Sequence, residues 1–227
     1  VMPIDAGRPI SIRAIDEALA RDRVLLIVSQ RDKEVETPRP SDLFEVGTAC
    51  NILKMRKNPD GSVQVLVQAF ARVRVREWLD LGDHLEARGE VLADEPGEPI
   101  LVKALVREVK DKFQALLKEG KYLAPEVAQF ILNLEDPSQL ADYVAFHMDF
   151  RLEDKQKVLE TANVAERLRA VLVLLEAELA LMEPQRRIQQ QVKEEIDRNQ
   201  REYFLRQQLK AIQRELGEDD PQQAEIN

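Results

Sequence analysis

Apolar and polar positions divide the chain into a first part with strand patterns and a second part with helix patterns. In residues 63–76 every second position is apolar and most of the others are Gln or Arg, which is typical of a strand with one buried face. The strand predicted over residues 23–31 is apolar without alternation at 24–28, which predicts burial on both of its faces. Further strands are predicted over residues 1–6 and 84–94.

The alternation also predicts how the central hairpin pairs. If Pro59-Asp60-Gly61 forms a three-residue loop with Gly61 in the left-handed region, paired residues have numbers that sum to 120. The inward pairs are then Leu53–Val67 and Met55–Val65, and the outward pairs are Arg56–Gln64 and Ile52–Gln68. A loop of two or four residues would turn polar side chains onto the inward face, so the pattern favours the three-residue loop.

The outward face of this hairpin is not wholly polar, because it carries Cys50, Ile52, Leu66 and Phe70. A short helix predicted over residues 11–21, with Ser11 as its N-cap, could cover these residues and make them ordinary core. Alternatively they form an exposed apolar patch, which on a protein surface usually marks a binding site. We predict Ile52, Leu66 and Phe70 as the binding residues of such a patch.

Beyond the Pro- and Gly-containing stretch 95–99 the patterns are helical. Helices are predicted over residues 100–118, 125–133, 137–148, 153–160 and 163–182. Pro125 and Pro137 stand where helices begin, and Gly120 is expected to end the first one. The wide apolar face of the fifth helix, which includes Leu168 and Leu175, predicts the core of a helical bundle. The fold class predicted from this order is α+β.

A last long helix is predicted over residues 185–216, because this stretch holds strong helix formers and neither Pro nor Gly. Roughly 32 residues at about 1.5 Å each would give a rod of about 48 Å, so one end should project from the preceding domain. Pro184 is expected to start or kink the helix, and Gly217 is expected to stop it.

The apolar stripe on this helix is thin. Its last part consists of Leu205, Leu209, Ile212 and Leu216, which follow the 4, 3, 4 spacing of a coiled-coil seam. A change of phase occurs between Tyr203 and Leu205, where a coiled coil would change its partner or winding. The helix either packs along its own domain or forms a seam with another domain or chain, and we favour the seam.

Composition narrows the possible functions. Most of the net charge of −9 lies in residues 111–184, which argues against a phosphate-binding surface there and against nucleic acid as a partner. A single cysteine, Cys50, excludes an internal disulfide and suggests a reducing compartment, hence a cytoplasmic location. No run approaches 18 apolar residues, so no membrane span is expected.

No catalytic or cofactor motif is found. Gly120-Lys121 has neither the upstream glycine nor the following hydroxyl of a nucleotide-binding loop. His84 and His147 stand without Cys or carboxylate residues at metal-ligand spacing, and Cys50 has no candidate base nearby. We therefore predict no catalytic residue, no cofactor and no metal in this chain.

The run from Asn199 to Gly217 resembles the segment that precedes the ATPase module of Lon-type ATP-dependent proteases. Phe204 and Gln207 depart from the family pattern, which usually has Tyr and Glu there. Upstream matches extend the resemblance over nearly the whole chain: Pro3 with Gly7-Arg8, Asp22-Arg23, and residues 25–32, 45–49, 59–61 and 65–67. The family has a short strand before the position of Val1, so residues preceding Val1 are expected.

The resemblance implies a PUA-like, partly closed β-barrel followed by a helical bundle and the long helix. The expected domains are a barrel over 1–97, a bundle over 98–183, the long helix over 184–217 and a disordered acidic tail over 218–227. The implied function is a non-catalytic region of a Lon-like serine protease that recognises unfolded or damaged proteins and assists assembly of a homo-hexamer. The implied assembly residues are Tyr203, Leu205, Leu209, Ile212 and Leu216.

An alternative function remains open, namely a stand-alone adaptor or chaperone-like protein with a coiled-coil arm and no attached protease. The length of the parent gene distinguishes the two, because an ATPase after residue 227 supports the first. An enzymatic function for the chain itself has no supporting residue.

Overall fold

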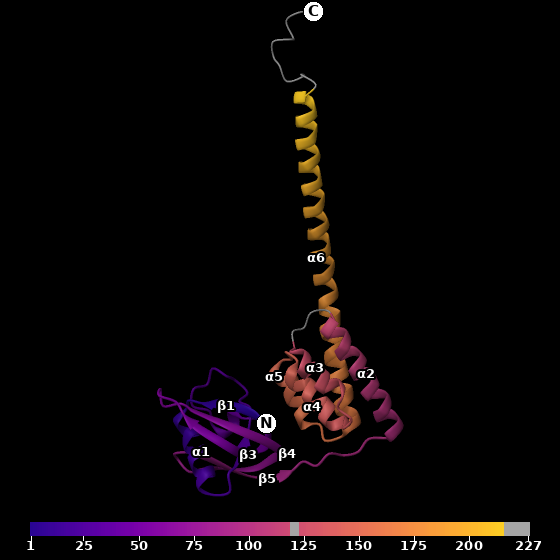
Figure 1. The fold of residues 1–227 in the computed structure, drawn as a ribbon. Helices are drawn as coiled ribbons and strands as arrows, with labels where there is room; N and C mark the ends of the chain where they lie inside the picture. The colour runs from indigo at the N-terminus through magenta and orange to yellow at the C-terminus, as the bar shows by residue number, and fades with distance from the viewer. Residues whose placement is uncertain (119–122, 216–227) are drawn as a thin grey trace, which may run out of the picture. The chain divides into compact units, whose positions relative to one another are not determined.

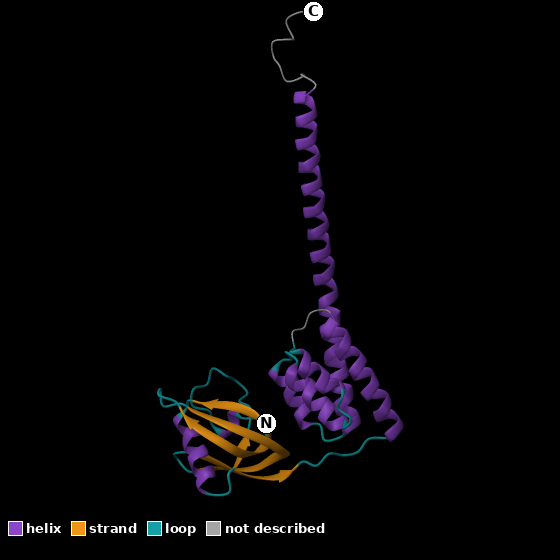
Figure 2. Ribbon diagram, in the orientation of Figure 1, coloured by secondary structure: helices purple, strands orange, loops and turns teal. Residues whose placement is uncertain are grey.

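The computed structural model of the protein describes residues 1–118 and 123–215 and confirms the α+β class (Figure 1). Along the chain the strands come first and the helices follow, apart from the short helix α1 among the strands; Figure 2 shows the strands in orange and the helices in purple. The elements are β1 Met2–Ala6, α1 Pro9–Ala20, β2 Val24–Ile27, the 3-10 turn η1 Pro40–Asp42, β3 Val46–Lys57, β4 Val63–Asp80, β5 Leu85–Val91, α2 Pro99–Lys118, α3 Pro125–Leu132, α4 Pro137–His147, α5 Leu152–Glu160 and α6 Val164–Glu215.

The five strands form one antiparallel sheet in the order β1-β4-β3-β2, and β5 also pairs with β4. β4 is long enough to pair with β1 near its start and with β5 near its end. Among the described residues the sheet does not close on itself, so the expected partial barrel closure is not seen. β2 is an edge strand and its Val24 is exposed, so the prediction of a strand buried on both faces was wrong.

The turn between β3 and β4 has the predicted three-residue form. Asn58 and Ser62 close the loop with a hydrogen bond of 2.9 Å from the Asn58 amide to the Ser62 carbonyl, and Gly61 has φ of +84°. Next to the turn the register is the predicted one, with Met55 opposite Val65 and Arg56 opposite Gln64. Glycine suits this loop because it adopts positive φ without steric strain.

Further from the turn the predicted register was wrong. A bulge at Leu53 shifts the ladder by one residue, so Val67 faces Ile52 instead of Leu53. Ile52 is therefore buried at 2% exposure and Leu53 is 41% exposed, the reverse of the predicted faces. A bulge inserts one unpaired residue, and every side chain beyond it changes face.

The sheet core lies between α1 and the inward face of β3 and β4. Its buried members are Ala6, Ile15, Ala18, Cys50, Ile52, Val63, Val65 and Val67. α1 begins at Pro9, not after Ser11, with Arg8 as an N-cap that makes no side-chain capping bond. Proline is favoured at the first helical position because its fixed φ suits the helix and it lacks an N–H that would remain unpaired there. Ser11 as the N-cap was therefore wrong.

The helices have their own buried apolar residues. α6 contributes Leu168, Val171 and Leu175, as its periodicity predicted, and α2 contributes Val109 and Phe113. The predicted helix boundaries agree with the structure to within one residue for α2 to α5 and at the start of α6. Gly120, expected to end the first of these helices, lies outside the described residues.

α6 is one continuous helix of 52 residues that contains Pro184, so the predicted helix start at Pro184 was wrong. Its first part belongs to a compact unit formed by Val1–Glu176, and its later part belongs to a second unit that begins at Ala177. The predicted stop at Gly217, the seam residue Leu216 and the acidic tail over 218–227 lie outside the described residues.

Candidate protein-binding surface

Two of the three predicted binding residues on the hairpin are accessible. Phe70 on β4 is 55% exposed and Leu66 is half-buried. Ile52 belongs to the sheet core, so its prediction as a binding residue is corrected. Its place at the surface is taken by Leu53, which the regular alternation had assigned to the interior.

Both exposed side chains, Leu53 and Phe70, stand at irregular positions of the β3–β4 ladder. Ala69 pairs with Cys50 and Ala71 pairs with Ala49, which leaves Phe70 as the extra residue of a second bulge. Leu66 pairs with Lys54, the residue after the Leu53 bulge. We call Leu53, Leu66 and Phe70 the sheet patch. Bulges re-aim side chains, and here they bring large apolar groups to the surface of the sheet.

A second group of aromatic side chains lies on α3 and α4, and the sequence analysis missed it. The rings of Phe130 and Tyr143 meet edge to face at 5.1 Å, those of Phe146 and His147 at 4.8 Å, and those of Tyr143 and His147 stack at 6.3 Å. Phe130 and Phe146 are exposed. The i, i+3 and i+4 spacing of Tyr143, Phe146 and His147 was the available signal.

The two histidines have different surroundings. Burial, followed by the nearby Lys155, lowers the pKa of His147. His84 is buried between two carboxylates, with Nδ1 2.7 Å from Asp83 and Nε2 3.4 Å from Glu86. The hydrogen bond with Asp83 is the main cause that raises the pKa of His84. His84 is therefore a packed histidine held by carboxylates, and within the described residues it belongs to no group of side chains suited to a metal ion.

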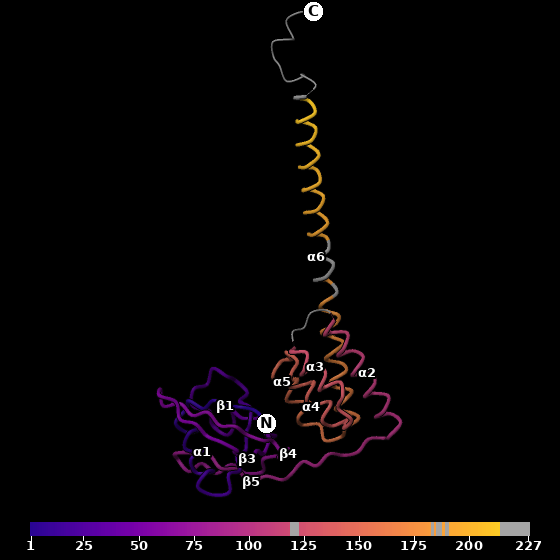
Figure 3. The backbone as a smooth tube through the Cα atoms, viewed as in Figure 1, coloured from indigo at the N-terminus to yellow at the C-terminus, as the bar shows by residue number. Residues whose placement is uncertain are grey.

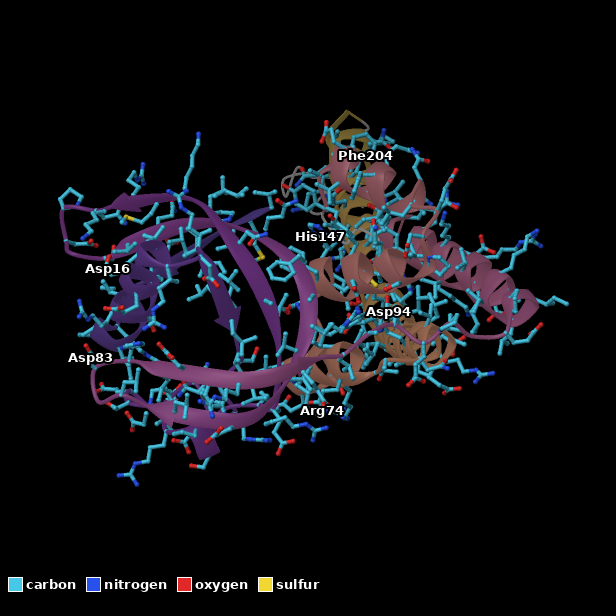
Figure 4. The ribbon with its side chains drawn as sticks, turned by 90° about the horizontal axis from the view of Figure 1, so that it is seen from below. Asp16, Arg74, Asp83, Asp94, His147 and Phe204 are labelled. Carbon is cyan, nitrogen blue, oxygen red and sulfur yellow. The ribbon has the colours of Figure 1, made fainter. Side chains whose placement is uncertain are left out.

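His84 belongs to a charged network that joins α1 to the turn between β4 and β5. Arg13 donates a hydrogen bond of 2.9 Å to Asp83, and Arg21 donates one of 2.7 Å to Glu86. Figure 4 shows Asp83 at the hairpin turn. Opposite charges are paired throughout the network, which is typical of a structural contact rather than of a catalytic site.

The other groups with potential reactivity do not form a site. Burial raises the pKa of the Cys50 thiol to about 11, which disfavours the nucleophilic thiolate. No group of three or more His, Cys, Asp and Glu side chains suited to a metal ion occurs in the described part of the chain. A groove of about 890 Å³ beside the start of α1 is lined by Arg8, Arg13 and Asp83 among others, and Arg13 and Asp83 are already paired with each other.

The predicted assembly residues on α6 are accessible where the structure describes them. Tyr203, Leu205, Leu209 and Ile212 are all more than half exposed, and so are Ile188 and Phe204. None of the described helices is both long enough and apolar enough to span a lipid bilayer.

Comparison with known proteins identifies the family to which this chain is similar. A family model described as the ATP-dependent protease La (LON) substrate-binding domain matches residues 1–177. The chain is 96% identical over 99% of its length to Lon protease 2 of Thermus thermophilus. It is 40% identical over 97% of its length to Lon protease of Escherichia coli (strain K12).

The chain spans 28% of the length of each of these two relatives. Among solved structures, the N-terminal domain of Mycobacterium avium complex Lon protease is similar, with a TM-score of 0.63 and 24% sequence identity. That match covers 77% of this chain and 90% of the other. At this identity the likeness concerns the fold alone.

Proposed function

Because this chain belongs to the Lon protease family, we propose that it is the non-catalytic region with which a longer ATP-dependent serine protease holds unfolded or damaged proteins. The family model that it matches is that of the substrate-binding domain, which implies protein substrates. ATP hydrolysis and peptide cleavage would then be carried out by other parts of the parent protein. We also propose a cytoplasmic location, from the single cysteine and the family.

The observation that supports this function best is the sheet patch. Unfolded chains present apolar side chains and backbone rather than a fixed shape, so a receptor for them needs accessible apolar groups and no deep cleft. Phe70, at 55% exposure, and Leu53, at 41%, are such groups on a rigid sheet. Leu66, which is half-buried, pairs with Lys54, the residue that follows Leu53 on β3.

The test compares binding of a reduced, carboxymethylated protein, which stays unfolded, with binding of the same protein in its native form. Fluorescence anisotropy with purified variants of this chain measures the affinity. Phe70→Ser and Leu53→Ser should each weaken binding of the unfolded form by about tenfold, which corresponds to about 1.4 kcal/mol. Leu81→Ser is the matched control, since Leu81 is similarly exposed but lies outside the patch.

Melting temperatures of the same variants separate binding from folding. Phe70→Ser should leave the melting temperature nearly unchanged. A loss of several kcal/mol of stability, as for a buried large-to-small change of roughly 2–5 kcal/mol, would show that the patch is core. Unchanged affinity in both patch variants would show that unfolded proteins bind elsewhere.

We further propose that α6 takes part in assembly with sister subunits, a homo-hexamer in the parent protein. The support is the spacing of Leu205, Leu209 and Ile212 together with their exposure. A seam of this length is about one and a half heptads, so association of the isolated chain should be weak and depend on concentration.

A further inference from the structure

Among the described residues, the buried sheet cluster around α1 includes no residue of α2 to α6, and the contact between the sheet and the helices contains a cluster of charged side chains. The sheet core is formed by residues of β1, α1, β3 and β4, and the helical core contains Val109, Phe113 and Leu168 among others. Between them lies what we call the junction cluster, which consists of Arg72, Asp94, Ser138, Asp142 and Arg167. Polar contacts between compact parts of a chain permit relative motion more readily than apolar ones.

Arg167 of α6 is held firmly. Its side chain is 0% exposed. Its Nε donates to the Thr161 carbonyl at 2.8 Å, its Nη1 to Ser138 Oγ at 2.7 Å, and its Nη2 to Asp94 Oδ1 at 2.6 Å. Every nitrogen of this guanidinium therefore has a partner, which a buried charge requires. Arg167 ties Asp94 of the linker to α4 and to its own helix.

Arg72 of β4 is held less completely, although its side chain is only 11% exposed. Its Nη1 donates to Asp94 Oδ1 at 2.7 Å, and its Nη2 donates to Asp142 of α4. Its Nε is buried and has no hydrogen-bond partner in the part of the chain that the structure describes. A buried donor without a partner costs free energy that Arg72 would recover in water, whereas Arg167 would lose a complete set of bonds.

The two carboxylates of the junction cluster, Asp94 and Asp142, also differ in how well their charge is stabilised. Burial tends to raise the pKa of Asp94, but hydrogen bonds from Arg167 and Ser138 outweigh it and the pKa is lowered. For Asp142 burial dominates over the attraction of Arg72 and Arg167, and its pKa is raised. Asp142 is the carboxylate that only Arg72 binds at hydrogen-bond distance, since Arg167 Nη1 lies 3.8 Å from it.

Backbone hydrogen bonds attach the start of the linker between β5 and α2 to the sheet and its later part to the helices. The Leu92 amide donates to the Arg72 carbonyl at 2.9 Å, which fastens Leu92 to the sheet. The Glu95 amide donates to the Ala162 carbonyl, and the Val164 amide donates to the Glu95 carbonyl, both at 3.0 Å, which fastens Glu95 to the helices. Only Ala93 and Asp94 lie between these attachments. Figure 3 shows this linker running from β5 to α2.

We propose that Arg72 is a releasable latch between the sheet and the helices. The junction opens when Arg72 leaves Asp94 and Asp142, while Arg167, Ser138 and Asp94 stay together on the helical side, and the chain bends at Ala93–Asp94. Within the described residues, the other side-chain hydrogen bond between the sheet and helices α2 to α6 runs from Gln156 Nε2 of α5 to the Val46 carbonyl at 2.9 Å and is neutral. The proposal does not depend on the protein-binding role of the sheet patch.

The experiment measures distances between spin labels at Lys54→Cys on β3 and Gln139→Cys on α4, two exposed positions. Cys50 can be kept, because it is buried and its thiol has a pKa of about 11, so it should not react with the label. Arg72→Met removes the latch but keeps much of its apolar stem. The matched control is Arg76→Met on the same strand. Arg76 pairs with Glu90 of β5, so both partners belong to the sheet and neither contacts the helices through this pair.

In Arg72→Met the distance distribution should broaden and gain a population at longer distance, and in Arg76→Met it should equal that of the unsubstituted chain. Asp142→Asn is a milder second variant and should broaden the distribution in the same direction. Unchanged distributions in Arg72→Met and Asp142→Asn would overturn the proposal. Loss of folding of the sheet and helices together in both variants would also overturn it, because Arg72 would then belong to one shared core.

Discussion

Ile52 faces Val67 across the β3–β4 ladder, because Leu53 is an extra residue on β3. Ile52 thereby fills the sheet core, and the neighbouring Leu53 contacts solvent. Ile52→Ala should lower the free energy of unfolding by about 2–4 kcal/mol through lost burial and a cavity. Leu53→Ala should lower it by less than about 1 kcal/mol. Urea titrations of both variants measure the difference, and equal losses would contradict the register.

Gly47 on β3 provides a second stability test. A Cβ at this position would lie 2.5 Å from the Ile27 carbonyl oxygen and 2.7 Å from Val28 Cγ2. Because the nearest atom is backbone, Gly47→Ala should cost about 1–3 kcal/mol, as overpacking typically does. Gly7→Ala is the control, since a Cβ at Gly7 would meet nothing within 4 Å. Thermal melts of both variants should show a fall for the first only.

The two histidines should respond to pH in opposite ways. The raised pKa of His84, mainly from its hydrogen bond with Asp83, contributes stability that is fully present below the unfolded pKa of about 6.5. That contribution is lost as pH rises through the folded pKa. His84→Gln should therefore differ most from the unsubstituted chain in mild acid, and the difference in melting temperature should shrink above neutral pH.

His147 is the natural comparison, because burial lowers its pKa. Its stabilising contribution is fully present above the unfolded pKa of about 6.5 and is lost as pH falls from there through the lower folded pKa. His147→Gln should differ most from the unsubstituted chain above neutral pH. Melting temperatures recorded between about pH 5 and pH 9 should give opposite trends for the two variants, and parallel trends would contradict these assignments.

The stripe on α6 predicts self-association. Leu209→Asp combined with Ile212→Asp should abolish any concentration-dependent association of the chain, because two charges enter the proposed seam. Gln200→Asp combined with Gln207→Asp adds the same charge seven residues apart, away from that seam, and should have little effect. Sedimentation velocity over a range of concentrations compares them, and an identical distribution in the seam variant would mean that the stripe packs only within its own chain.

The residues of the turn were sufficient to predict the strand register of the β3–β4 hairpin next to that turn. Pro59-Asp60-Gly61 fixes the loop, and the pairing of Met55 with Val65 follows from it. The bulge could not be predicted, because Ile52 and Leu53 are adjacent and both suit the interior. The choice between them depends on how the whole sheet bends over α1. The sheet patch was therefore predicted with one wrong member and without Leu53.

The junction cluster had no local signal at all. Arg72 and Asp142 are 70 positions apart, and each resembles an ordinary charged residue on a strand or helix.

The continuity of α6 through Pro184 conflicts with the usual effect of proline, which interrupts a helix. Strong helix formers on both sides of it outweigh the loss of one hydrogen bond, so the helix does not start at Pro184 but continues through it.

Pro184 gives α6 a mechanical weak point. Since proline has no amide hydrogen, the carbonyl of Ala180 cannot receive the hydrogen bond that every turn of a regular helix supplies. Tension or torque applied to the helix beyond Ala177 would be relieved first by bending at this turn. Bending at this turn would reduce the force that reaches the packed residues Val171 and Leu175. Movement of the later part of α6 would then disturb the helical core less than it would through an unbroken helix.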